Sequence, residues 1–363
     1  MMLNINHKTV IKDNRVYVIF LTIYLNVLEL LPITSLYDEK LYPKMKKKIE
    51  GASMKKLSAA KSMDAVAKTL LWIGAAMLVQ PCFALTYTIP AQGNVVGHIQ
   101  YTTASRHDSL STVGRRHNIG GYEMKEANPG VGYKNPRAGK KLLVPSRFVL
   151  PDAPRKGIVI NLAELRLYYY HPDGRRVSTF PVGVGQDGWN TPLGKTSIVR
   201  KRANPTWVVP KSILENHRRL GKPIPKSMPP GPKNPLGTHA LSLGFKNIVI
   251  HGTPYPRGVG LRSSHGCIRM LPEDIRKVFD MVPMGTPVNI VHQPNKVGYL
   301  GKQVFVESHV PISSSMYGGN HSIEYSVKKI VNKTGVKMNI NWHQARKARS
   351  QASGYPKAIG RVL

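Results

Sequence analysis

Apolar runs separated by glycine- and proline-rich turns dominate the chain from about residue 156 onward. The runs at 158–170 and 175–185 flank the turn sequence HPDG, so they predict two long antiparallel strands. Shorter apolar runs predict further strands at 196–199, 240–243, 248–250 and 288–291. With few helical segments among them, these strands indicate a mainly β domain, built as a β-sandwich or an open barrel.

One helix is predicted within this β region, over residues 271–282. Pro272 fits the first turn of a helix, and Glu273 and Asp274 complement the positive end of the helix dipole. The last segment, 293–363, is interpreted as a small appended subdomain. It begins with a strand in the sequence KQVFVESHV and ends in a basic helical piece, and it carries no recognisable chemistry.

Residues 97–147 form a module with a pattern of their own. A short strand leads to a helix at about 110–117, a second helix ends at Asn128-Pro129-Gly130, and a final strand covers 141–145. This βααβ pattern resembles a LysM domain, a small module that binds glycans containing N-acetylglucosamine, except that Arg106-His107 replaces the usual Lys-Gly before the aspartate. The resemblance implies anchoring to peptidoglycan, and a small helical spacer is the alternative.

The stretch from Met54 to Ala84 has the three parts of a secretory signal: lysines, an apolar run at 70–79, and a small-residue cleavage site. We therefore expect cleavage after Ala84 and a periplasmic, cell-wall-associated protein. Residues 1–53 are interpreted as an overextended start, with Met54 as the initiator. The alternatives are a membrane anchor at 16–33 and a short core helix in place of the signal.

The net charge of the 363 residues is +34, and the residues after Ala84 keep +28 because they hold 41 basic and 13 acidic side chains. Such a charge favours an anionic partner and says little about the fold. Cys82 would leave with the signal, so the exported chain would carry Cys267 alone and could form no internal disulfide. A proline-rich linker at 150–157 separates the module from the β domain.

Two motifs have weak interpretations. The sequence GVGQDG at 183–188 matches a dinucleotide-binding pattern, but Pro192 and Gly194 follow where the phosphate-binding helix should begin. We therefore assign its glycines to turns. The residues His239, His251, His265 and Cys267 lack the paired spacing of a zinc site, so no metal is expected among them.

The stronger interpretation makes Cys267 a nucleophile. A thiol needs a nearby base to form the reactive thiolate, and His251, at the end of a predicted strand, lies sixteen residues before it. No acidic residue follows His251, so a backbone carbonyl near Gly252 is expected to orient its ring. Gly266 permits a tight turn that exposes the amides of Gly266 and Cys267 as an oxyanion hole. A buried, unreactive cysteine is the alternative, but the surrounding SSHG sequence is polar.

The sequences NIVIHGT (247–253) and SSHGCIRM (263–270) resemble the motif of the YkuD-type L,D-transpeptidases, in particular the ErfK/YbiS-like periplasmic members. NTPLGKTSI and NPLGTHALSL resemble further words of that family, and the resemblance covers about 156–310, with the catalytic domain at 156–292. It implies that Cys267 attacks the diaminopimelate carbonyl of a tetrapeptide stem and expels D-alanine, with His251 taking the thiol proton.

The same resemblance assigns Ser264, His265 and Gly266 to the oxyanion or substrate-binding region. Arg269 would hold a stem-peptide carboxylate or brace the loop, and a structural salt bridge is the alternative. The acceptor would be a second diaminopimelate, giving 3-3 cross-links, or a lysine of a lipoprotein or outer-membrane protein. With water as acceptor the enzyme would be an L,D-carboxypeptidase. The resemblance also implies that no metal and no organic cofactor is required.

Two other classes of function compete with this one. An inactive wall-binding protein is disfavoured by the intact His251 and Cys267. A nucleic-acid binder is suggested by the charge and by ARKARS at 345–350, but the signal sequence and the lack of a nucleic-acid motif argue against it.

Overall fold

The computed structural model describes residues 85–312, 317–319 and 321–363. The predicted signal sequence, the start at Met54 and the rest of 1–84 lie outside the described residues. Within the described part of the chain, no helix has the length and apolar character needed to cross a membrane.

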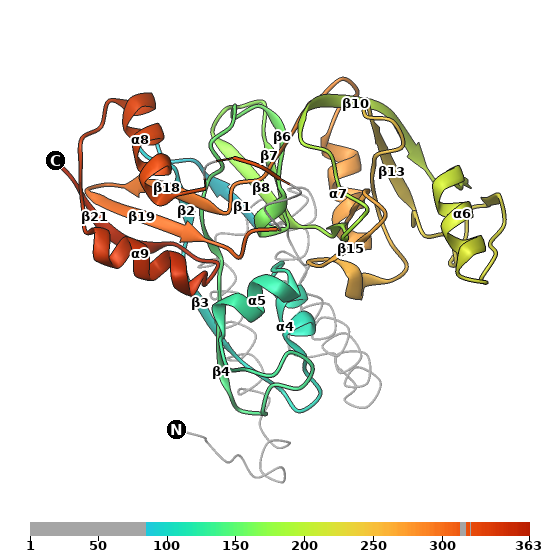
Figure 1. The fold of residues 1–363 in the computed structure, drawn as a ribbon, viewed down its shortest axis with the longest axis horizontal. Coiled ribbons are helices and arrows are strands. Elements are labelled where there is room, and N and C mark those ends of the chain that lie inside the picture. The colour runs from blue at the N-terminus through green and yellow to red at the C-terminus, as the bar shows by residue number, and fades with distance from the viewer. Residues whose placement is uncertain (1–84, 313–316, 320) are drawn as a thin grey trace, which may run out of the picture. The chain divides into compact units, whose positions relative to one another are not determined.

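A curled sheet of nine strands forms the centre of the β domain, in which the sequence predicts the catalytic residues (Figure 1). In spatial order its strands are β1 (Leu85–Thr88), β8 (Arg176–Pro181), β7 (Arg166–Tyr170), β6 (Gly157–Asn161), β17 (Pro287–Val291), β10 (Gly194–Ala203), β13 (His239–Leu243), β14 (Val249–His251) and β16 (Ile268–Arg269). Neighbours are antiparallel except β17–β6 and β14–β16. Every residue of β6 and β7 is buried, because both faces of the sheet are covered there. The mainly β prediction is confirmed.

Three details differ from the sequence predictions. The run 158–170 is not one strand: it is divided between β6 and β7 by a short 3-10 helix, Leu162–Glu164, and by Leu165, whose φ of 57° reverses the chain. The helix α6 (Lys211–Arg219) was not predicted, because only Ile213 in it is buried and its pattern is mostly polar. The strand β1 joins the catalytic sheet although it precedes the module at 97–147. The predicted helix at 271–282 is confirmed as α7 (Pro272–Met281).

The module has the predicted βααβ order: β3 (Gln100–Thr103), α4 (Leu110–Arg116), α5 (Gly121–Ala127) and β4 (Lys141–Val144). Ser109 begins α4 by accepting a hydrogen bond from the Thr112 N–H. A second pair of short strands, β2 (Val95–Gly97) and β5 (Arg147–Val149), closes the module. Its apolar core is continuous with side chains of the catalytic sheet, including Val159 and Tyr168, so the module is packed onto that sheet.

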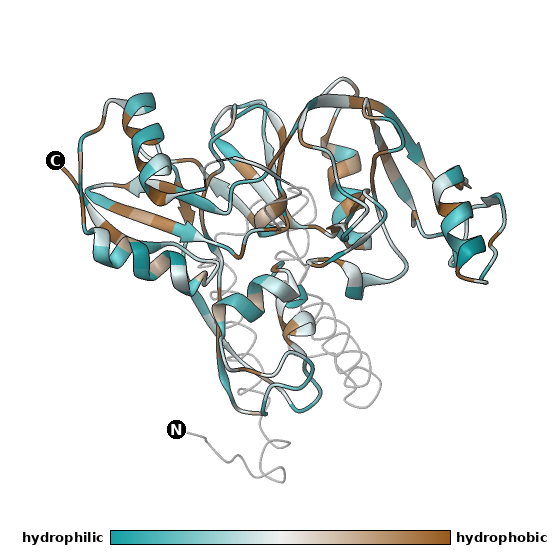
Figure 2. Cartoon of the chain, viewed as in Figure 1, coloured by the Kyte–Doolittle hydropathy of each residue, from teal (hydrophilic) through white to brown (hydrophobic). Residues whose placement is uncertain are grey.

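The C-terminal subdomain is a complete α/β unit. Its sheet has the order β18 (Asn295–Leu300), β19 (Gln303–Ser308), β21 (Lys357–Val362) and β20 (Met338–Ile340), and two helices, α8 (Ile323–Thr334) and α9 (Trp342–Gln351), pack on it. Figure 2 shows apolar residues along β19 and polar residues along α9. The predicted strand and basic helix are confirmed, whereas α8 was not predicted.

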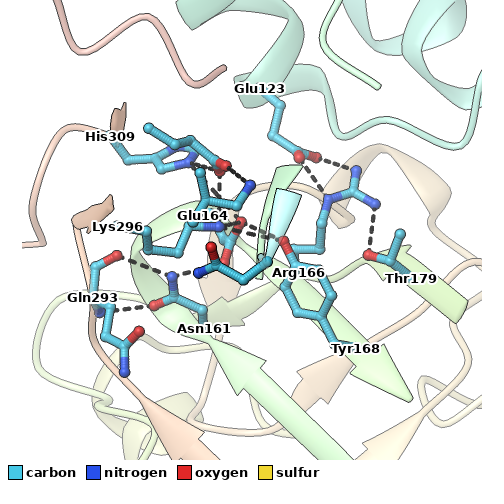
Figure 3. A network of polar contacts seen from close by, with 12 residues as sticks. Glu123, Asn161, Glu164, Arg166, Tyr168, Thr179, Gln293, Lys296 and His309 are labelled. Atoms are coloured by element: carbon cyan, nitrogen blue, oxygen red, sulfur yellow. Dashed lines mark hydrogen bonds and ion pairs between the residues drawn. The ribbon is translucent and has the colours of Figure 1, made fainter. Parts of the chain in front are cut away.

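Buried charges join these three parts (Figure 3). Arg166 of β7 makes a bidentate pair with Glu123 of α5, at 2.7 and 2.8 Å. Lys296 of β18 lies 2.6 Å from Glu164 and 2.8 Å from Glu307. His309 contacts Glu307 at 2.8 Å and Glu126 of α5 at 2.9 Å. We call these residues the buried ion network: Glu123, Glu126, Glu164, Arg166, Lys296, Glu307 and His309.

Candidate active site

Cys267 lies on the loop between β15 (Arg262–Ser264) and β16, beside the strand that carries His251. The parallel pair β14–β16 aligns Ile250 with Ile268 and His251 with Arg269. Because side chains alternate along a strand, His251, Cys267 and Arg269 share one face while the two isoleucines enter the core. All three line one cavity of about 760 Å³. The structure thus brings together the two residues that the sequence predicted as nucleophile and base.

His251 is held as a neutral base. Its side chain is buried, and Nδ1 lies 2.5 Å from the Gly252 carbonyl oxygen, the contact expected from the sequence. The Nδ1–H donates to that oxygen, so Nε2 is left unprotonated and able to accept a proton. Burial lowers the pKa of His251 to about 4; the Gly252 carbonyl opposes this shift and the Arg269 charge adds to it.

Cys267 rests as a thiol. Burial raises the pKa of the Cys267 thiol, an effect that a backbone hydrogen bond from Val249 and the Arg269 charge only partly offset. Sγ lies 3.4 Å from the Asn247 carbonyl oxygen, which accepts a hydrogen bond from the thiol. A raised thiol pKa beside a lowered histidine pKa favours an uncharged pair, and proton transfer to His251 is needed to form the thiolate.

The turn before Cys267 is fixed by Ser264. Gly266 has φ +97°, a conformation that favours glycine. Ser264 Oγ accepts from the Gly266 N–H at 3.2 Å and donates to the Cys267 carbonyl at 2.6 Å. The sequence predicted that the Gly266 N–H would face the oxyanion, but in the structure this N–H donates to Ser264 within the loop. Ser264 braces the turn, and the Cys267 N–H, for which the described residues supply no acceptor, remains available to an oxyanion.

His265 and Arg269 flank the nucleophile in different ways. The His265 ring meets the Trp189 ring edge-on at 4.5 Å, and burial lowers its pKa, with further lowering by Arg269 and His217. Arg269 Nη1 donates to the Ser263 carbonyl at 3.0 Å. Of the roles that the sequence left open for Arg269, which were substrate binding, bracing the loop and a structural salt bridge, this contact corresponds to bracing the loop.

The cavity wall holds residues that the sequence did not single out. Trp189, His217 and Tyr255 line it together with the segment around α6, and so do the cations Arg202, Lys233 and Lys246. No carboxylate occurs among the described lining residues, so the cavity suits an anionic substrate. The excess of basic residues in the sequence indicated an anionic partner, but the sequence alone could not show which of these residues surround one cavity.

A cluster of possible metal ligands lies away from the cavity that holds Cys267. Among the described residues, Glu164, Glu307 and His309 form a cluster with the spacing of metal ligands. The Lys296 ammonium lies 2.6 and 2.8 Å from the two carboxylates, so a cation already occupies that position.

Comparison with known proteins agrees with this geometry. Residues 155–290 match the family model described as the L,D-transpeptidase catalytic domain, YkuD. The chain is 37% identical over 289 residues to the probable L,D-transpeptidase ErfK/SrfK of Escherichia coli K12, covering 76% of this chain and 91% of that protein. The chain belongs to the L,D-transpeptidase family. The probable L,D-transpeptidases YcfS and YbiS of the same organism are 40% and 38% identical, over 67% and 68% of this chain and 78% and 83% of theirs.

An L,D-transpeptidase is an acyltransferase that acts on peptidoglycan, and this family assignment gives the chain its enzyme class and its substrate polymer. The inactive wall-binding alternative is not favoured by these relatives.

Proposed function

We propose that Cys267 is the nucleophile of this L,D-transpeptidase and that His251 is its general base. The observation that carries this assignment is the shared cavity, in which His251 and Cys267 lie on one face of adjacent strands and the Gly252 carbonyl fixes the histidine tautomer. His251 Nε2 takes the Sγ proton, and the thiolate attacks the diaminopimelate carbonyl of a tetrapeptide stem. The oxyanion that forms is met by the Cys267 N–H.

The rest of the cycle follows from the same groups. The imidazolium returns its proton to the amine of the departing D-alanine, which leaves a thioester on Cys267. An acceptor amine loses a proton to His251 and attacks the thioester, and the thiol is restored. The burial that lowers the pKa of His251 favours a fast return of the proton in both steps. The cationic wall of the cavity would hold the carboxylates of the stem.

Release of D-alanine from a purified disaccharide-tetrapeptide tests this assignment. The chain from Leu85 onward should release D-alanine, and Cys267→Ala should release none. A carbapenem should add covalently to the peptide that contains Cys267, as seen by mass spectrometry. D-alanine release by Cys267→Ala at the wild-type rate would refute the nucleophile assignment.

We further propose periplasmic export and glycan binding by the βααβ module. The acceptor is a second stem amine or the lysine of a lipoprotein or outer-membrane protein, with water as the hydrolytic alternative. Muropeptide analysis of a deletion strain distinguishes these acceptors, because only the first predicts loss of 3-3 cross-links. Pull-down of residues 85–363 by peptidoglycan sacculi, compared with Cys267→Ala to remove covalent capture, tests the module.

A further inference from the structure

The peptide group between Gly266 and Cys267 is held from its carbonyl side by Thr191. Thr191 Oγ1 donates to the Gly266 carbonyl at 2.9 Å and accepts from the Gly185 N–H at 3.0 Å. The Thr191 side chain has no exposed surface, so water does not compete for these bonds. The carbonyl oxygen next to the nucleophile therefore has one fixed direction.

A residue of the C-terminal segment supports Thr191 in turn. Tyr317 lies on the connection from β19 to α8, and its hydroxyl donates to the Thr191 carbonyl at 3.1 Å. Its side chain is 4% exposed, and its ring stacks on His292 with centroids 5.0 Å apart and an interplanar angle of 28°. A chain of two hydrogen bonds thus runs from the segment after the catalytic domain to the loop of Cys267.

Because the peptide bond is planar, these two hydrogen bonds also determine the direction of the Cys267 N–H. In a trans peptide the C=O and the following N–H point in opposite directions, so fixing the Gly266 oxygen also fixes the Cys267 N–H. In the described part of the chain this N–H has no acceptor, whereas the Gly266 N–H is taken by Ser264. The preorganised direction of an amide decides how well it stabilises an oxyanion.

We propose that Thr191 and Tyr317 are positioning residues that aim the Cys267 N–H at the oxyanion of the acyl-transfer step. This inference rests on the proposed role of Cys267 as nucleophile. It also gives the C-terminal subdomain a part in the chemistry, because Tyr317 lies outside the residues that match the family model.

The test compares two reactions of the same thiol. Acyl transfer passes through an oxyanion, whereas alkylation by iodoacetamide displaces iodide at a saturated carbon and forms none. Thr191→Val should lower kcat for D-alanine release about tenfold or more at unchanged KM and leave the alkylation rate within about twofold. Thr191→Ser, which restores the hydroxyl, should recover most of kcat. Tyr317→Phe should lower kcat by a smaller factor, about threefold.

Tyr170→Phe is the matched control, because Tyr170 is a buried tyrosine whose hydroxyl has no hydrogen-bond partner among the residues that the structure describes. The kcat of this variant should equal that of wild type. The proposal is overturned if Thr191→Val keeps full kcat, or if acyl transfer and alkylation fall together. If Thr191→Val does not fold, Tyr317→Phe tests the proposal alone. An unchanged kcat in Tyr317→Phe would then overturn the proposal. A wild-type protein that alkylates but releases no D-alanine would instead refute the proposed function.

Discussion

Two regions of this protein bury ionisable side chains, and they treat charge in opposite ways. In the buried ion network each cation lies within 2.9 Å of a carboxylate. Beside Cys267 the described cavity wall holds no carboxylate, and burial shifts the pKa values of His251 and Cys267 toward their neutral forms, an effect that the Arg269 charge offsets only in part for Cys267. The buried ion pairs fix the arrangement of the βααβ module, the catalytic domain and the C-terminal subdomain. The neutral side chains of His251 and Cys267 can instead exchange a proton during a reaction.

The first prediction removes the base from the neutral pair. His251→Ala should lower kcat/KM for D-alanine release by about 10⁴-fold, on the order of 5 kcal/mol, because the thiol then has no proton acceptor. The melting temperature should fall only modestly, because the substitution leaves no buried charged group without its ion-pair partner. Alkylation of Cys267 should still rise with pH, as expected for a thiol with a raised pKa. Retention of wild-type kcat/KM would contradict the neutral-pair mechanism.

The second prediction breaks a charge pair of the network. Arg166→Met should destabilise the protein by about 3–5 kcal/mol, because Glu123 would be buried without its partner. The double variant Glu123→Gln/Arg166→Met should recover part of this loss, since no uncompensated charge remains. Urea unfolding of both variants measures the effect. If the single and double variants are equally unstable, the stacking of the Arg166 guanidinium over the Phe148 ring, rather than its pair with Glu123, carries the stability.

The sequence predicted much of what depends on local pattern. The βααβ module, the helix α7 and the Cys267–His251 pair all follow from short motifs and turns. The buried ion network could not be predicted, because Glu123 and Arg166 look like ordinary surface charges until the sheet and α5 are packed together. The support of the active-site loop by distant residues was hidden for the same reason: it joins segments that are far apart in the chain.

The break in the run 158–170 shows a different limit. Its apolar residues are continuous, so the pattern predicts a single strand. The reversal depends on Leu165 adopting a left-handed conformation, which is uncommon for a leucine and has no sequence signal. The side chain of Leu165 is buried in the main core, and that packing stabilises the turn.

The third prediction uses pH to weaken the network alone. Burial by itself would lower the pKa of His309, but Glu126 and Glu307 raise it to about 10. His309 therefore contributes stability that is complete below its unfolded pKa of about 6.5 and is lost as the pH rises toward 10. The free energy of unfolding should fall by on the order of 4 kcal/mol between pH 6.5 and 10, because each pKa unit between the folded and unfolded states corresponds to about 1.4 kcal/mol. In His309→Gln this slope should be much smaller; an equal slope in both proteins would show that other groups cause it.

The fourth prediction concerns an ion pair of the βααβ module that is exposed to water, and its effect on the free energy of unfolding should be the smallest. Arg115 of α4 pairs with Glu273 of α7 at 2.9 and 3.1 Å, with side chains 47% and 29% exposed. Both this pair and the Arg166–Glu123 pair join the βααβ module to the catalytic domain with bidentate geometry, but the Arg166–Glu123 pair is buried and Arg166 also donates to Thr179 and to the Asn118 carbonyl. Glu273→Gln should cost about 0.5 kcal/mol in urea unfolding, and less in high salt, because water and ions screen an exposed pair. A loss as large as that of Arg166→Met would mean that burial does not explain the strength of the module's attachment.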